Sequence, residues 1–164
     1  NAKLSGSTLV GKFNGTKFIN AQLCDCTIEN YSDFNGVDFS GASCKHLKSK
    51  YEHDESEFAA RFTDCNFREA KFNYAILENF HFCGSRFSDA DFSGASLGSN
   101  FLACDLKHVK TNHDTKATGF SLYGNDWDDA HTRPSAEKQK LIEIILNQVQ
   151  SDLREIILRD KAHI

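Results

Sequence analysis

The sequence predicts an all-β solenoid, a right-handed quadrilateral β-helix of five-residue repeats followed by a C-terminal α-helix. Three observations predict this fold. Large apolar residues recur at every fifth position, small residues recur two positions before them, and residues 135–164 change to the periodicity of a helix. The 164 residues are enough for one domain with a hydrophobic core of its own.

The five-residue period is clearest in the block that begins at Ala60. Its large residues are Phe62, Phe67, Phe72, Leu77, Phe82, Phe87, Phe92 and Leu97. The small residues two positions earlier are Ala60, Cys65, Ala70, Ala75, Ser85, Ala90 and Ala95, with Phe80 as the exception. Neither a lone helix nor a lone strand has this period. A chain that turns a corner every five residues has it, because four corners close a square coil with the large side chains inside.

Such coils stack about 4.8 Å apart, with backbone hydrogen bonds between them. Residues one coil apart become vertical neighbours, so we expect Phe62 against Phe82 and Phe72 against Phe92. The same frame extends in both directions with one-residue slips. It runs through Leu4, Leu9, Phe13, Phe18, Leu23, Ile28, Phe34, Phe39 and Cys44 before the block, and through Phe101, Leu106, Thr111, Leu122 and Trp127 after it.

Several repeats carry a recognisable motif. Ala90–Gly94 (ADFSG), Val37–Gly41 (VDFSG) and Cys104–Leu106 (CDL) are close copies of A(D/N)LXX. On these residues the chain resembles the pentapeptide-repeat family over about four fifths of its length. The resemblance implies a β-helix domain over residues 1–134 and bacterial relatives.

One segment, Lys45–Glu57 (KHLKSKYEHDESE), fits no five-residue repeat and is predicted to be a loop that leaves one corner of the β-helix. Two interpretations stay open: a tolerated surface insertion, or a loop that contacts a partner. The second interpretation assigns the contacts to Lys45, His46, Lys48, Lys50, Tyr51 and His53.

Residues 135–164 are predicted to form an amphipathic helix that starts after Pro134. Its apolar stripe comprises Ile142, Leu146, Val149, Leu153, Ile156 and Ile157. The first half can cap the last coil, as a solenoid end requires, and the second half would overhang. We therefore weigh a self-contained cap against a homodimer or interdomain contact, with the latter favoured. The start at Asn1, without Met, predicts a fragment or a processed piece of a longer protein.

The sequence shows no recognisable catalytic site. No set of nucleophile, base and oxyanion donor is found, and no metal or cofactor site is predicted. The six Cys are interpreted as reduced thiols, which favours the cytoplasm. Packing at the small inward position accounts for Cys26, Cys65 and Cys104. A net charge of −4 argues against direct nucleic-acid binding, and no apolar run approaches the roughly 20 residues that span a bilayer.

The predicted function is a non-catalytic scaffold that binds a protein through a rigid β-helix surface. The family resemblance adds two alternatives. One is a DNA mimic that binds a type II topoisomerase, as in quinolone resistance, but the expected outward ladders, such as Arg61–His81–Asn100, are not acidic. The other is a binding module of a larger secreted bacterial effector, such as a HECT-like ubiquitin ligase, which would act in a host cytosol.

Overall fold

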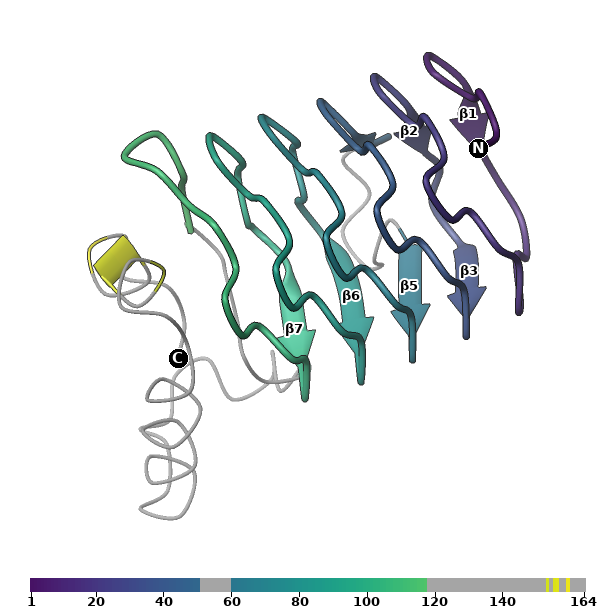
Figure 1. The fold of residues 1–164 in the computed structure, drawn as a ribbon. Helices are drawn as coiled ribbons and strands as arrows, with labels where there is room; N and C mark the ends of the chain where they lie inside the picture. Colours follow the sequence, from purple (N-terminus) through teal and green to yellow (C-terminus); the bar gives the residue numbers. More distant parts are fainter. Residues whose placement is uncertain (51–59, 118–152, 154, 157–158, 160–164) are drawn as a thin grey trace.

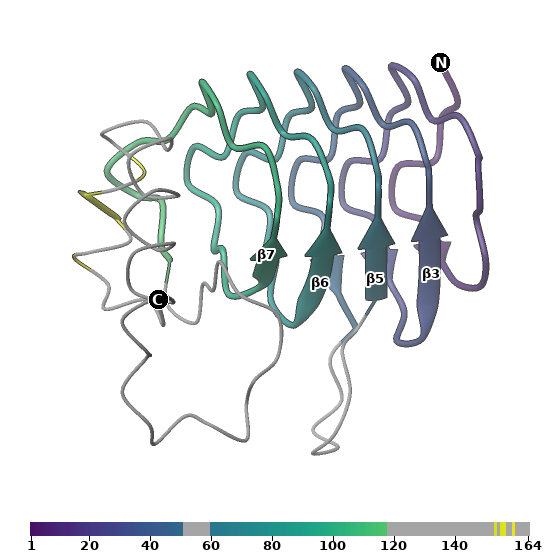
Figure 2. The same cartoon turned by 90° about the horizontal axis from the view of Figure 1, so that it is seen from below.

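The computed structural model describes residues 1–50, 60–117, 153, 155, 156 and 159. Short strands alternate with turns along a coil that rises from one end of the molecule to the other (Figures 1 and 2). The strands are β1 (Thr8–Leu9), β2 (Thr27–Ile28), β3 (Ser32–Asn35), β4 (Lys48–Ser49), β5 (Ala60–Thr63), β6 (Phe80–Cys83) and β7 (Asn100–Leu102).

The strands form two sheets, with the orders β1-β2-β4 and β3-β5-β6-β7, and every pairing is parallel. In Figures 1 and 2 the strands of the second sheet lie side by side, one from each successive coil. Isolated parallel bridges, such as Asn66↔Arg86 and Lys71↔Asp91, form the other two sides of the coil. The predicted quadrilateral β-helix is therefore confirmed.

Stacked phenyl rings fill the interior of the coil. Phe62 lies between Phe34 and Phe82, with ring centroids 4.5 and 4.9 Å away, and Phe82 continues to Phe101 at 4.8 Å. The expected pair Phe72 and Phe92 is also stacked, at 5.2 Å. Each buried phenyl ring contributes about 1.5–3 kcal/mol through loss of contact with water, so these columns are the main source of stability.

The small inward positions do more than make room for the rings. Where the residue is Cys, Ser or Thr, its side chain donates a hydrogen bond to a backbone carbonyl of the preceding coil. Examples are Cys65 Sγ to Phe34 O at 3.1 Å and Ser85 Oγ to Phe62 O at 3.1 Å. Buried polar side chains need such partners, and the pattern explains why these residue types share one position.

The corners of the coil require left-handed backbone. The residue two positions after the central one has a positive φ, for example 52° at Asp64, 57° at Tyr74 and 61° at Gly84. Asn, Asp and Gly tolerate this region best, and they occupy many of the corners. Each corner side chain therefore points outward, where it borders two faces of the β-helix.

The predicted loop starts later than the sequence indicated. Lys48–Ser49 is strand β4, paired with β2 through Thr27↔Lys48, and Leu47 is buried. Ser49 occupies the central position that Ile28 holds one coil earlier, so a polar residue concealed the repeat. The expectation that the frame ends at Cys44 is wrong. The remainder of the predicted loop, residues 51–59, lies outside the described residues, as do Leu122 and Trp127.

Four residues of the predicted C-terminal helix are described, and all four are helical: Leu153, Glu155, Ile156 and Arg159. They lie beside the last coil of the β-helix (Figure 1). The rest of residues 135–164 lies outside the described part of the chain.

Candidate interaction surface

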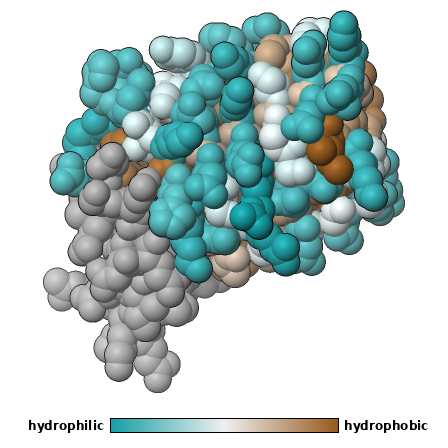
Figure 3. Space-filling model, in the orientation of Figure 1, coloured by the Kyte–Doolittle hydropathy of each residue, from teal (hydrophilic) through white to brown (hydrophobic). Residues whose placement is uncertain are grey.

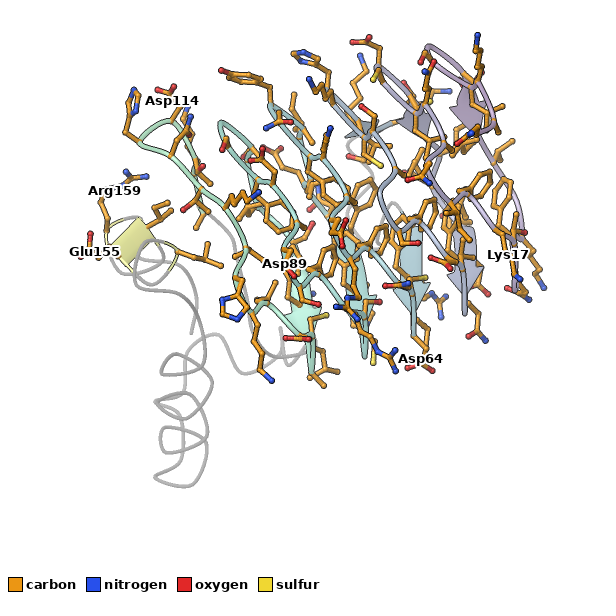
Figure 4. The ribbon with its side chains drawn as sticks, in the orientation of Figure 1. Lys17, Asp64, Asp89, Asp114, Glu155 and Arg159 are labelled. Atoms are coloured by element: carbon orange, nitrogen blue, oxygen red, sulfur yellow. The ribbon has the colours of Figure 1, made fainter. Side chains whose placement is uncertain are left out.

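The outward side chains form vertical ladders whose register is fixed by the backbone pairing. Lys12↔Asp33↔Arg61↔His81 runs along one face, and Lys17↔Asp38↔Asn66↔Arg86↔Asp105 along the next. Opposite charges alternate along both ladders, which favours cross-strand attraction. The face in Figure 3 is accordingly mostly hydrophilic, and Lys17, Asp64 and Asp89 point away from the core in Figure 4.

A third ladder carries Lys71, Asp91 and Lys110. Burial of the Asp91 carboxyl would raise its pKa, but hydrogen bonds from Ser93 and Asn73 outweigh this and lower the pKa below its ordinary value. Asp91 is therefore a carboxylate at neutral pH, flanked on both sides by lysines. None of these ladders is a continuous acidic stripe.

One corner departs from this polar pattern. The rings of His46 and Tyr74 stack with their centroids 5.7 Å apart and an interplanar angle of 14°. On its other side the Tyr74 ring lies against Gly94, where an added Cβ would come within 2.5 Å of the ring carbons Cδ1 and Cε1. Tyr74 nevertheless keeps 54% of its surface exposed. It is an exposed aromatic side chain held in place from both sides.

The adjoining face extends this feature. Ile76 takes an outward position and pairs with Lys48 of the preceding coil, and it is 46% exposed. The same ladder holds Thr27, Ser96 and other polar residues. We call the four exposed residues His46, Lys48, Tyr74 and Ile76 the corner patch.

The described residues of the predicted partner-contact set lie on the β-helix itself. Lys45, His46 and Lys48 are exposed on one coil. Lys50 is also exposed, and its Nζ lies 3.4 Å from Glu29 Oε1 on the preceding coil. His46 and Lys48 belong to the corner patch. Tyr51 and His53 lie outside the described residues.

The described residues of the predicted tail interface are buried in the molecule's own core. Leu153 and Ile156 belong to the same apolar cluster as the phenyl columns. Arg159 Nη2 donates a hydrogen bond to the carbonyl oxygen of Thr115, a residue of the last coil, at 2.8 Å. Figure 4 shows Arg159 and Glu155 close to this coil. Ile142, Leu146, Val149 and Ile157 lie outside the described residues.

A family model named "Pentapeptide repeats" matches residues 60–98, in eight copies. This segment of the chain consists of pentapeptide repeats. No curated protein matches its sequence significantly.

Solved structures of pentapeptide-repeat proteins resemble this chain to different degrees. Rfr23 from the cyanobacterium Cyanothece 51142 is 18% identical, with a TM-score of 0.58, over 70% of this chain and 86% of Rfr23. HetL from Nostoc sp. PCC 7120, described as involved in the regulation of heterocyst differentiation, is 18% identical over 76% of this chain and 65% of HetL, with a TM-score of 0.43. QnrB1, a plasmid-mediated fluoroquinolone resistance protein, is 15% identical over 87% and 83%, with a TM-score of 0.38. The likeness to Rfr23 supports the fold, and the two lower scores add no argument.

Sequence reasoning missed half of the corner patch. Tyr74 and Ile76 lie inside the most regular pentapeptide repeats, where attention goes to the inward residues. The available signal was an apolar residue at an outward position and an aromatic residue at a corner. The contact between His46 and Tyr74 could not be predicted from the sequence, because the insertion between them hides which corner each residue occupies.

The cysteines of the β-helix are separate from one another, and several are deeply buried. All six are free thiols. Burial raises the pKa of Cys65 and of Cys104 to about 12, although a backbone hydrogen bond opposes the shift in each case, and burial raises the pKa of Cys44 further still. Thiols with raised pKa values are poor nucleophiles, so these cysteines serve packing.

Two features are absent from the part of the chain that the structure describes. It contains no group of three or more His, Cys, Asp or Glu side chains placed to hold a metal ion. In these same residues no helix is long and apolar enough to cross a membrane.

Proposed function

We propose that this pentapeptide-repeat protein is a non-catalytic scaffold that binds a protein partner through its β-helix surface. The corner patch is the observation that supports the proposal, because it combines exposed apolar area with side chains that are already held in place. A pre-ordered surface loses little conformational entropy on binding. Exposed aromatic residues on rigid frames are typical contact residues of protein interfaces.

The six free thiols support a reducing compartment, such as the cytosol, as the place of action. The charge pattern does not favour the DNA-mimic alternative. A protein that imitates a phosphate backbone needs a continuous run of carboxylates, whereas the charges of the described ladders alternate in sign. A homodimer through Leu153 and Ile156 is not supported either, because both side chains are buried within their own chain.

Binding can be tested with the immobilised full chain in a nuclease-treated extract of the cells that produce the protein. We expect it to retain one or a few proteins that the free chain competes away and that then bind the purified chain saturably in titration calorimetry. Retention of no protein that the free chain competes away, or binding that never saturates, would contradict the scaffold. A gyrase supercoiling assay tests the DNA-mimic alternative. A DNA mimic inhibits gyrase at about equimolar protein, and the scaffold does not.

A further inference from the structure

The corner patch has the chemistry of a docking site for one kind of partner. We propose that it binds an acidic peptide segment that carries a bulky apolar side chain. This inference rests on the proposed scaffold function and specifies its partner.

The corner patch contains an apolar seat, which is formed by the Tyr74 ring and the Ile76 side chain. Tyr74 is fixed between His46 and Gly94, so its outer ring edge and the neighbouring Ile76 present a constant apolar surface. Ile76 lies two residues from Tyr74, on the adjoining face, so the two side chains flank one edge of the β-helix. An aliphatic or aromatic side chain laid across this edge contacts both without any rearrangement of the scaffold.

Gly94 shows that the seat is built into the fold. Its φ of 72° does not by itself demand glycine, because His46 and Tyr74 adopt similar values, 55° and 57°, in the same corner column. What excludes other residues is the Tyr74 ring, which occupies the space of a Cβ. The glycine therefore allows the ring to lie flat against the next coil.

The charge next to the seat is positive and available. Lys45 and Lys48 are exposed beside His46, and neither forms an ion pair with any residue that the structure describes. The nearby carboxylates of Glu29 and Glu78 are engaged, the first with Lys50 and the second with the hydroxyl of Ser96. Two ammonium groups that pair with no described carboxylate lie beside an apolar seat, and they complement a segment that carries Asp or Glu around an apolar residue.

The size of the patch favours a peptide over a folded domain. Four side chains offer much less than the roughly 800 Å² per partner of a stable interface between globular proteins. A nucleic acid would need a free face of the Tyr74 ring to stack a base, but His46 covers one face and Gly94 lies against the other. Ile76 also offers a phosphate nothing, so the observations favour the peptide.

The experiment selects displayed random 12-residue peptides on the full chain and then compares the enriched peptides on variants by fluorescence anisotropy. We expect enriched sequences with more Asp and Glu than Lys and Arg and with at least one Trp, Phe, Leu or Ile. Their affinity should fall at least about tenfold in each of Tyr74→Ala, Ile76→Ser and Lys48→Glu. Single-stranded DNA of equal charge should not compete.

Matched controls exist in the same fold. Tyr31 is 74% exposed at another corner, with a φ of 63°, so Tyr31→Ala removes the same side chain from the same backbone geometry. Lys107→Glu makes the same charge change on a different face. Both controls should bind the peptides as the wild type does, and unfolding curves verify that every variant is folded.

Three results would overturn the inference: no enriched peptide, enriched peptides that are basic, or peptides that bind Tyr74→Ala and Ile76→Ser like the wild type. Competition by the DNA would assign the patch to a nucleic acid instead. If the retained cellular partner binds all patch variants unchanged, the scaffold function stands and the patch is not its site. If no cellular partner is retained, the scaffold function fails by its own test.

Discussion

Arg159 Nη2 donates a 2.8 Å hydrogen bond to the backbone carbonyl oxygen of Thr115. The last described coil has no described coil beyond it to donate hydrogen bonds to its carbonyl groups, so its edge needs other partners. The guanidinium satisfies one of these carbonyls, while Leu153 and Ile156 from the same turns of helix are buried in the core. We therefore expect the described helical residues to cap the solenoid.

The cap leads to the first prediction. Leu153→Asp should lower the free energy of unfolding by more than about 3 kcal/mol, because it buries a carboxylate and removes apolar contact. Arg159→Ala should cost about 1–2 kcal/mol through the lost charge-assisted hydrogen bond. Urea unfolding measures both. Glu155→Ala, an exposed change in the same helix, should stay within about 0.5 kcal/mol; a Leu153→Asp chain as stable as the wild type would disprove the cap.

The contact between Tyr74 and Gly94 predicts a second effect. Gly36→Ala should cost about 1 kcal/mol, because its φ is 63° and nothing lies near the added methyl group. Gly94→Ala should cost about 1 kcal/mol more, because the methyl group displaces the Tyr74 ring. Combined with Tyr74→Ala, the Gly94→Ala cost should fall to that of Gly36→Ala. An additive double mutant in urea unfolding would show that ring and glycine do not interact.

The phenyl column predicts a graded loss of stability. Phe62 is stacked on both sides and buried, so Phe62→Ala should cost about 3–5 kcal/mol. Phe13, which is only partly buried, stacks on Phe34 in the same column, and Phe13→Ala should cost clearly less. Denaturant midpoints compare the two. Equal losses would indicate that the column does not stabilise through burial.

The raised thiol pKa values predict a dependence on alkaline pH. The unfolded thiol of Cys65 ionises near its ordinary pKa of 9.0, whereas the native thiol stays protonated up to about 12. Its contribution is intact below pH 9, and the free energy of unfolding then falls by up to about 1.4 kcal/mol per pH unit as pH rises. The variant for comparison is Cys65→Ser, because serine keeps a hydrogen-bond donor at this position, as Ser85 does one coil later.

The comparison between pH 7 and 10.5 should therefore show a flatter stability profile for Cys65→Ser than for the wild type. Because Lys and Tyr titrate in both chains alike, only the difference between the two profiles reports on the thiol. Parallel profiles would mean that the native thiol is not protected by burial.

Local periodicity made most of the core predictable. Phe62 and Phe82, or Phe67 and Phe87, lie one regular coil apart, so their stacking follows from counting residues. The outward ladders follow from the same count. Prediction failed at Ser49, where a polar side chain at the central position hid the coil, and at Tyr74 and Ile76, whose outward placement carried no sign of their neighbours.

The sequence by itself determined the repeating corner, the inward Phe and Leu columns and the polar exterior, because each depends only on spacing within about one coil. Tertiary structure alone decided that His46 stacks on Tyr74, 28 residues later and across an insertion, and that Leu153 and Ile156 enter the chain's own core. The physical reason is that an insertion of arbitrary length erases the count that fixes register, and an apolar helix face does not specify which surface will cover it.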